Sequence, residues 1–497
     1  DSTTAKPAVT RYAFTAESSS DQKVKMTDQR GNVWNYTFDA SGRVKSFLSP
    51  RSGNPETKAY DVNNSVTQYT TAQGGTGTLS YDGYNVTSIS EANGAKSTFD
   101  YLDGDTKNKP SKYTDPRGVG IDYDWNSREQ LTKVTTSDSQ TTINYQSATD
   151  ACPGMPSSSK DGKGNVTTYT YTGCNLTKID RPAPAGDSTM TYDSNNRLAT
   201  ATDGKGNKQT ITYNAKDQVT KITWTKPGAS TSTSSVTYTY DANGNRTQRV
   251  DSHAGTSKTT AWGLDARNRV TSEDLPNVDN SYTYDVAGNM ASMTTPAGTT
   301  TYTYDIENDP ASVTTPAGKK ISMGYGEHVS AWIDYPGGVR DRQDMDSSGR
   351  IQRIYQNRAN PDNTFTALTD LNYGYTSPGG KKTSSVYAVD DDTFNFHVDY
   401  DYDSSGRITH ESSTKNNVKR SENTYGYDAN SNMTSQSTWI TPTQTNSVTS
   451  SYNAANQLTA VSGDFSMSLT YDANGSTLTQ GTDSFTWDLR NRMASAT

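Results

Sequence analysis

The sequence predicts an all-β protein: a spiralling array of about 21 antiparallel β-hairpin repeats that forms a hollow shell or β-strip, with almost no helix. Three observations lead to this prediction. A short phrase built on tyrosine and aspartate returns about every 22 residues, each copy alternates like a strand, and two turn signals bound each copy. A fixed period of this size is typical of repeat proteins, in which each unit contacts mainly its neighbours.

The repeated phrase is clearest in the middle of the chain. Residues 238–246 and 282–290 both read Tyr-Thr-Tyr-Asp followed by a turn. We take the second aromatic residue of each copy, or the residue in its place, as the anchor of that copy, and the 21 anchors span 449 residues. They are Phe38, Tyr60, Tyr81, Tyr101, Trp125, Tyr145, Tyr171, Tyr192, Tyr213, Tyr240, Leu264, Tyr284, Tyr304, Tyr325, Met345, Tyr375, Tyr402, Tyr427, Tyr452, Tyr471 and Trp487.

The residues before each anchor have the periodicity of a strand. Tyr302 and Tyr304 lie two residues apart, so both rings point to one face of a strand and Thr303 points to the other. Tyrosine buries a large ring while its hydroxyl finds a polar partner, which suits a thin wall. We therefore expect the aromatic face to lie inside the array. The inner-face aromatic residues are Tyr171, Tyr192, Tyr213, Tyr240, Tyr284, Tyr304, Tyr402, Tyr427, Tyr471 and Trp487.

Two turns complete each unit. The first reads Asp-x-x-Gly-Arg or a close variant, in which Asp binds its own backbone and Gly or Asn supplies a positive φ. An apolar residue six positions after the anchor, such as Val219 or Met290, starts the return strand. The second turn reads Asp-Gly-Lys-Gly at residues 161–164 and 203–206. About forty strands joined in this way exceed the ~10 that an open sheet tolerates, so the sheet must curl or spiral.

The array has no linker and no break in composition. We assign residues 1–35 to a degenerate N-terminal repeat start and residues 36–497 to one continuous array, which we expect to be truncated at its C-terminal end. Copies near Tyr101, Tyr145 and Tyr325 are degenerate, and 30 residues separate Met345 from Tyr375. Insertions are expected at these places.

The two cysteines, Cys152 and Cys174, are 22 residues apart, which is one repeat period. This spacing puts them on adjacent units, and we expect a disulfide, which fits an oxidising, extracellular setting. The alternative is a pair of buried free thiols that fill small gaps.

Composition argues against two kinds of partner. The net charge is -8 and the pI is near 5.2, without the basic stripe that nucleic acid binding requires. No stretch approaches the ~18 consecutive apolar residues of a membrane-spanning helix, so we expect no membrane span.

We identify no catalytic, cofactor or metal site. The four histidines have no HExxH spacing, and no Gly-x-Ser-x-Gly or Walker A motif occurs. Loops beginning at Asp241 and Asp472 resemble the first half of a calcium loop, but turns explain them better. The densest group of carboxylates is interpreted as a solvated strand face with a turn cap, with calcium binding or acid/base catalysis as the alternatives. It comprises Asp390, Asp391, Asp392, Asp399, Asp401 and Asp403.

The phrase Tyr-x-Tyr-Asp-x-x-Gly-Asn/Arg, some twenty times in register, resembles the RHS/YD-repeat family over nearly the whole chain. That family includes bacterial Rhs polymorphic toxins, toxin-complex subunits, wall-associated proteins and teneurins, whose β-strip wraps into a hollow shell. The resemblance implies a container wall, with any toxin domain as separate cargo. Self-cleaving members carry a closing region that does not follow Met493, and residues 115–118, Asp-Pro-Arg-Gly, hold an ordinary turn position. Cleavage activity is therefore not carried over.

Two functions follow from this resemblance. The first is a non-catalytic extracellular shell, secreted or on a bacterial cell surface, that encloses or presents a polypeptide or toxin domain. The alternative is a cell-surface adhesion or glycan-binding module that uses exposed aromatic residues such as Trp34, Trp332 and Trp439. Open strand edges also suggest self-association.

Overall fold

The protein is one continuous β-ribbon. The computed structural model describes residues 10–16, 21–72, 74–102, 108–326, 329–346, 350–360, 364–375, 382–388, 396–441 and 444–497. These ranges contain strands and turns but no helix, which confirms the predicted all-β class. Accordingly, no helix in the described ranges has the length and apolar character needed to cross a membrane.

The ribbon has 44 strands within the described ranges. Those of the first half are β1 (Arg11–Ala16), β2 (Gln22–Thr27), β3 (Val33–Phe38), β4 (Val44–Leu48), β5 (Glu56–Tyr60), β6 (Val66–Thr70), β7 (Thr76–Asp82), β8 (Asn85–Ser90), β9 (Lys96–Tyr101), β10 (Pro110–Thr114), β11 (Gly120–Trp125), β12 (Leu131–Thr135), β13 (Gln140–Tyr145), β14 (Pro156–Lys160), β15 (Val166–Thr172), β16 (Asn175–Asp180), β17 (Ser188–Tyr192), β18 (Leu198–Thr202), β19 (Lys208–Tyr213), β20 (Val219–Thr225), β21 (Ser234–Tyr240) and β22 (Arg246–His253). Those of the second half are β23 (Thr256–Leu264), β24 (Val270–Asp274), β25 (Asp279–Tyr284), β26 (Met290–Thr295), β27 (Gly298–Tyr304), β28 (Pro310–Thr314), β29 (Lys320–Gly326), β30 (Val329–Asp334), β31 (Val339–Met345), β32 (Ile351–Ala359), β33 (Phe365–Tyr375), β34 (Lys382–Ala388), β35 (Phe396–Tyr402), β36 (Ile408–Lys415), β37 (Val418–Tyr427), β38 (Met433–Thr441), β39 (Gln444–Tyr452), β40 (Leu458–Gly463), β41 (Met467–Tyr471), β42 (Thr477–Gln480), β43 (Asp483–Trp487) and β44 (Met493–Ala496).

Each strand pairs antiparallel with the strands before and after it, from β1 to β44. The odd-numbered strands from β3 to β43 carry the 21 anchors at or next to their C-terminal ends, so the counted repeats are the hairpins. The hairpin of β1 and β2 joins the same sheet within the segment assigned to the degenerate repeat start. Within the described ranges, β1 and β44 are the strands that pair on one side only.

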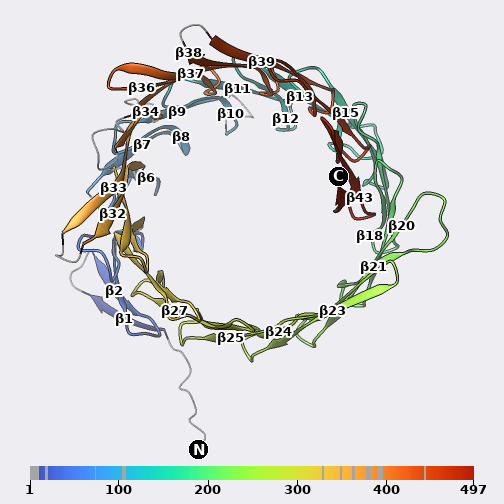
Figure 1. Cartoon of the computed structure of the whole chain (residues 1–497). Coiled ribbons are helices and arrows are strands. Elements are labelled where there is room, and N and C mark those ends of the chain that lie inside the picture. Colours follow the sequence, from blue (N-terminus) through green and yellow to red (C-terminus); the bar gives the residue numbers. More distant parts are fainter. Residues whose placement is uncertain are drawn as a thin grey trace, which may run out of the picture.

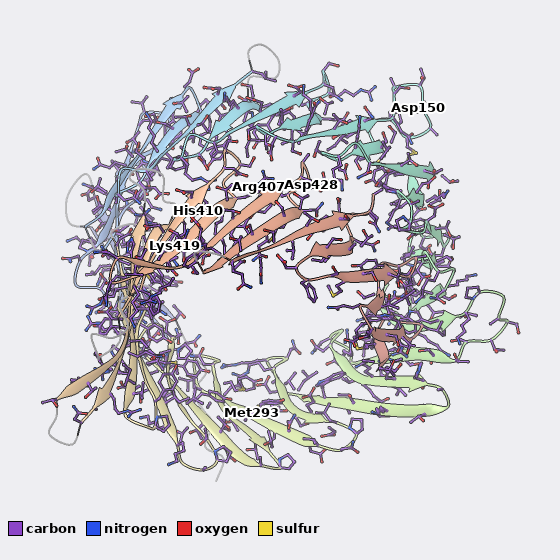
Figure 2. All side chains as sticks on the ribbon, turned by 45° about the horizontal axis from the view of Figure 1, so that its top comes forward. Asp150, Met293, Arg407, His410, Lys419 and Asp428 are labelled. Atoms are coloured by element: carbon purple, nitrogen blue, oxygen red, sulfur yellow. A yellow bond between two sulfur atoms is a disulfide. The ribbon has the colours of Figure 1, made fainter. Side chains whose placement is uncertain are left out.

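The ribbon curls into a ring that continues past one full turn, so its C-terminal part overlies its N-terminal part (Figure 1). The centre of the ring stays open when all described side chains are drawn (Figure 2). The protein exposes 27777 Å², whereas a compact protein of this mass would expose about 18,000 Å². The wall is thus a single layer with two solvated faces, and the predicted hollow shell is confirmed.

The turns after the anchors follow the predicted chemistry. A carboxylate oxygen of Asp241 accepts a hydrogen bond of 2.8 Å from the backbone N–H of Asn245, and Gly244 has a φ of 92°. Asp472 caps its turn in the same way. Asp115 accepts bonds from the backbone N–H groups of Arg117 and Val119, as expected of a turn residue. The calcium-like loops and the Asp-Pro-Arg-Gly segment are therefore turns.

Irregular repeats change the length of a hairpin without interrupting the sheet. The 30-residue interval between Met345 and Tyr375 is taken up by the long strands β32 and β33, of 9 and 11 residues. After Tyr145 the connection is longer and contains Cys152, which forms a disulfide with Cys174 across a Cα–Cα distance of 5.1 Å. Cys152 is buried. The bond ties this connection to the following turn.

Candidate functional site: the ring wall and its seam

The anchor residues bind each repeat to the one before it. The Tyr240 hydroxyl donates a hydrogen bond of 2.7 Å to the carbonyl oxygen of Val219, and the Tyr304 hydroxyl donates one of 2.9 Å to that of Met290. Both acceptors are apolar return residues of the preceding repeat. Sixteen of the 21 anchors in the described ranges make this contact, among them Trp487, whose indole N–H donates to Thr477. We call this series the tyrosine ladder.

A β-bulge at each anchor accompanies the ladder. Tyr240 opposes Arg246, whereas Thr239 opposes Gln248, so one extra residue is inserted directly after the turn. The bulge breaks the regular pairing at the return residue. The carbonyl oxygen of this residue accepts the hydrogen bond that the hydroxyl of the next anchor donates. Burial raises the pKa of the Tyr304 and Tyr471 hydroxyls, which keeps these groups protonated as donors.

Nine of the ten aromatic residues expected on the inner face belong to this ladder. Tyr171 is the tenth, and its hydroxyl is not among the ladder donors, although its neighbour Tyr169 lies 3.2 Å from the Ser159 hydroxyl. The strand before Tyr240 shows the expected alternation, since Tyr238 is half-buried and Thr239 is exposed. The aromatic face is therefore the better-covered face of the wall.

The fifth residue of the first turn also joins neighbouring repeats, which the sequence patterns did not reveal. The Arg197 guanidinium donates a 2.8 Å hydrogen bond to Asp193 in its own turn and lies 4.5 Å from the ring centroid of Tyr213 in the next repeat. Where asparagine takes this place, the Asn245 side chain bonds to Asp241 and to Asn268 of the next turn. One position thus closes its own turn and contacts the following one.

A seam joins the two overlapping coils of the ring. Its contacts connect residues 238–295 positions apart in the sequence, which is about the length of one turn of the spiral. At the seam, second turns of the earlier coil, such as residues 161–164, contact first turns of the later coil, such as residues 428–432. In a sheet wound as a spiral, the first turns lie along one edge of the ribbon and the second turns lie along the other edge. At the seam, the edge of one coil contacts the opposite edge of the next coil.

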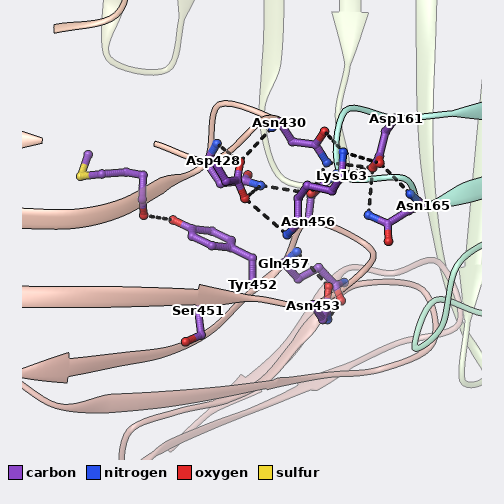
Figure 3. A network of polar contacts seen from close by, with 12 residues as sticks. Asp161, Lys163, Asn165, Asp428, Asn430, Ser451, Tyr452, Asn453, Asn456 and Gln457 are labelled. Atoms are coloured by element: carbon purple, nitrogen blue, oxygen red, sulfur yellow. Dashed lines mark hydrogen bonds and ion pairs between the residues drawn. The ribbon is translucent and has the colours of Figure 1, made fainter. Parts of the chain in front are cut away.

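The same arrangement of contacts occurs at two places in the seam, and Figure 3 shows the one that joins Asp161 and Lys163 to Asp428 and Asn430. The Lys163 backbone N–H donates to the Asn430 side-chain oxygen (3.2 Å), the Asn430 amide donates to Asp161 (2.8 Å), and the Lys163 ammonium lies 3.3 Å from Asp428. We call each such set a clamp. The second clamp has the same contacts and joins Asp203 and Lys205 to Asp472 and Asn474.

Both clamps require glycine at the second position of the Asp-Gly-Lys-Gly turn. A Cβ atom added at Gly162 would lie 2.6 Å from the Ala429 carbonyl oxygen, and one added at Gly204 would clash with the Ala473 carbonyl oxygen. The coils therefore approach each other backbone to backbone.

Arginines hold the two ends of the seam. Arg51 is 12% exposed and lies 2.5 Å from both Asp305 and Asp309. Arg490 is 8% exposed and lies 2.7 Å from Asp251. These buried cations are fully paired, which is the condition for a charge to be stable in such a place.

The residues of the seam were not found from the sequence, although a signal is present. A basic residue stands third in several second turns of the first coil, at Arg30, Arg117, Lys163 and Lys205, although residues 71–74 and 91–94 have glutamine and asparagine in this place. The equivalent turn at residues 315–318 of the second coil reads Thr-Pro-Ala-Gly and has no charge. This asymmetry marks the edge that faces another coil.

We expect acid to open the seam. Hydrogen bonds from Ser405 and Arg407 lower the pKa of Asp138. Burial raises the pKa of Asp428, but hydrogen bonds, chiefly from Asn432 and with one from Lys163 across the seam, outweigh it and the net pKa is lowered. A lowered pKa in the folded state contributes stability above the unfolded value of about 3.9, and this stability is lost as pH falls through the folded pKa.

The coils should therefore separate below about pH 4 while the hairpins persist. Energy transfer between dyes on opposite sides of the seam, recorded with far-UV circular dichroism, measures both events. The variant D428N with D472N should show a smaller change with pH. A dye separation that stays constant through this range would contradict the expectation.

The carboxylate group near β35 does not form a metal site in the described residues. Asp390, Asp391 and Asp392 lie outside the described residues. Asp403 caps its turn, as predicted, and Asp401 lies 3.0 Å from His410, which also lies 2.9 Å from Glu422. Within the described ranges, no group of three or more potential metal ligands occurs.

One expectation about surface aromatic residues is wrong. Trp34, Trp332 and Trp439 were expected to be exposed, but all three are half-buried. Arg340 lies 4.8 Å above the Trp332 ring and Lys419 lies 5.0 Å above that of Trp439. Cations from adjacent strands cover these rings because long side chains on one face of a sheet contact each other across strands.

Comparison with known proteins supports a class of repeat protein. Residues 284–320 match the family model described as RHS Repeat, and residues 364–496 match the model described as Teneurin YD-shell. The resemblance to RHS/YD repeats is confirmed over these two segments. None of the curated proteins matches the chain.

Particular solved structures share the fold. The crystal structure of TcdB2-TccC3 has a TM-score of 0.65 and 16% identity over 96% of this chain and 29% of that chain. The same pair without its hypervariable C-terminal region gives 0.64 and 16% over 95% and 28%. The Photorhabdus luminescens Tc holotoxin pore gives 0.58 and 14% over 99% and 29%. The chain thus spans less than a third of these proteins, and the likeness is one of fold.

Proposed function

We propose that this chain is a wall segment of a hollow, non-catalytic shell that encloses or presents a polypeptide. The observation that carries the proposal is the ring itself, a single-layer wall around an open centre (Figure 2). The likeness in fold to TcdB2-TccC3 supports it. We further propose a secreted or cell-surface protein of bacteria, as the carrier part of a polymorphic toxin or as a wall-associated protein.

The C-terminal end of the chain lies on the inner side of the ring wall (Figure 1). A flexible polypeptide appended after Thr497 therefore starts inside the ring. We expect a protease to cut it about tenfold more slowly than the same polypeptide inserted between Ala229 and Ser230, because the wall restricts access. The connection between β20 and β21, which holds that control site, projects outward in the same view. Equal cleavage rates at the two sites would contradict the enclosure.

We also propose that the aromatic face is the inner face. Tyr238 and Thr239 are neighbours on opposite faces of β21, so they form a matched pair. In the variant with the appended polypeptide, a photo-reactive residue at position 238 should capture it and one at position 239 should not. The reverse result would place the threonine face inside.

The adhesion or glycan-binding module remains an alternative proposal. Its support is weaker, because the three tryptophans that suggested it are half-buried and cations lie over the rings of Trp332 and Trp439. Self-association would use the free edges of β1 and β44, which offer unpaired backbone groups.

A further inference from the structure

The two clamps at the seam begin from the same three residues, Asp-Ala-Asn, at positions 428–430 and 472–474. This tripeptide occurs once more in the chain, at Asp241, Ala242 and Asn243. The third copy lies in the first turn between β21 and β22, in the first coil. It is therefore on the edge of the ribbon opposite to the edge that forms the seam.

The third copy has the same local structure as the two clamps. In each, the Asp carboxylate accepts a bond from the backbone N–H four residues on, at 2.8 Å in Asp241, 2.9 Å in Asp428 and 2.9 Å in Asp472. The second carboxylate oxygen of Asp241 accepts from Asn245, as that of Asp428 does from Asn432. The geometry that receives a turn at the seam is thus already formed at Asp241.

The third copy differs from the two clamps in its exposure to solvent and in the partner of its alanine carbonyl oxygen. Asn430 and Asn474 are half-buried under the Asp-Gly-Lys-Gly turns that they bind, whereas Asn243 is exposed. Its side-chain amide makes a long bond of 3.3 Å to Asn268. The Ala242 carbonyl oxygen accepts a bond of 2.9 Å from the Lys216 ammonium, while the equivalent Ala473 oxygen accepts from the backbone N–H of Gly186 across the seam.

We propose that Asp241, Ala242 and Asn243 form a docking site for an Asp-Gly-Lys-Gly turn carried by a further strip of tyrosine-aspartate hairpins. The partner's aspartate accepts from the Asn243 amide, its lysine backbone N–H donates to the Asn243 oxygen, and its ammonium pairs with Asp241. The proposal goes beyond the enclosure of a polypeptide, because it concerns the outer edge of the coil and not the space inside the ring.

The chemistry restricts the partner. The glycine before the lysine is needed because a side chain there meets the alanine carbonyl oxygen, as it does at Gly162 and Gly204. The lysine supplies the positive charge that the Asp241 carboxylate lacks in its own turn, where its partner is the neutral Asn245. Asp193 does not fit as well, because Arg197 of its own turn already neutralises it.

The test uses the full chain and a hairpin peptide with the sequence of residues 158–168, which contains the Asp-Gly-Lys-Gly turn, cyclised by a disulfide between two cysteines added at its ends. A carbodiimide joins a lysine amine to a carboxylate without a spacer, so the bond forms most efficiently where the two groups already lie at ion-pair distance. We expect cross-linking at Asp241 to exceed that at Asp193 and Asp265 by about tenfold. A tenfold preference corresponds to a difference of about 1.4 kcal/mol in binding free energy. The side-chain amide signal of Asn243 should shift in the NMR spectrum as the peptide is added.

Two variants and one altered peptide make the result specific. N243L should lose the preference for Asp241, and K216A should keep or increase it, because Lys216 competes for the Ala242 oxygen. A peptide with valine in place of the glycine at position 162 should not cross-link. Equal cross-linking at the three aspartates, or none at Asp241, would overturn the proposal.

Discussion

Replacing Tyr240 with alanine is expected to lower the free energy of unfolding by about 3 kcal/mol, because the half-buried ring leaves a gap between two repeats. The Y240F variant keeps the ring and removes only the hydroxyl that donates to the Val219 carbonyl at 2.7 Å. Its expected cost is about 1 kcal/mol, the net value of one hydrogen bond. Urea denaturation measures both.

The matched control is T239A, one residue away on the exposed face of the same strand. Its expected effect is within about 0.5 kcal/mol. Because repeat proteins unfold in part through local openings, hydrogen exchange of the β20 and β21 amides locates the effect at this repeat interface. If Y240A were as stable as T239A, the ladder would not hold the repeats together.

The R490A variant should release the last hairpin of the ribbon from the first coil. Arg490 donates to Asp251, to the Ser234 hydroxyl and to the carbonyl oxygens of Ser235 and Ser252. It also lies 4.5 Å from the ring centroid of Trp224. Loss of one partner of a buried ion pair costs about 3–5 kcal/mol. The value expected here is near the lower limit, because Asp251 keeps Arg249 at 2.5 Å.

The same turn provides the control. Arg492 pairs with Asp488 within its own turn and is 52% exposed, so R492A should cost less than about 1 kcal/mol. Hydrogen exchange at the amides of β43 and β44 distinguishes the two variants, since only R490A should expose them. Equal protection in both variants would show that the seam does not depend on Arg490.

The local structure was predictable because it depends on short-range chemistry. The alternation of Tyr238 and Thr239 specifies a strand, and the Asp241 turn closes on its own backbone within five residues. The 21 anchors therefore predicted the positions of the hairpins, and the number of strands predicted that the sheet is curled. A polar partner was expected for each tyrosine hydroxyl, but the partner itself was not identified. The sequence does not tell which carbonyl group a β-bulge leaves available as an acceptor.

The seam was not predictable for a different reason. Lys163 and Asp428 are in contact only because the curvature of the sheet returns the chain to its starting sector after about one coil. A small change in twist per strand, summed over a whole coil, would bring another turn opposite Lys163. The repeat itself contains no information on this sum.

The sequence by itself determined the repeat, its strands and turns, and the all-β class, because each depends on residues a few positions apart. The tertiary structure decided the pairing of coils, the burial of Arg51 and Arg490, the covering of the tryptophans and the exposure of Asn243. These features depend on curvature accumulated over many strands. Turns with the same three residues, Asp-Ala-Asn, are consequently half-buried at the seam in two places, whereas Asn243 of the third is open to solvent.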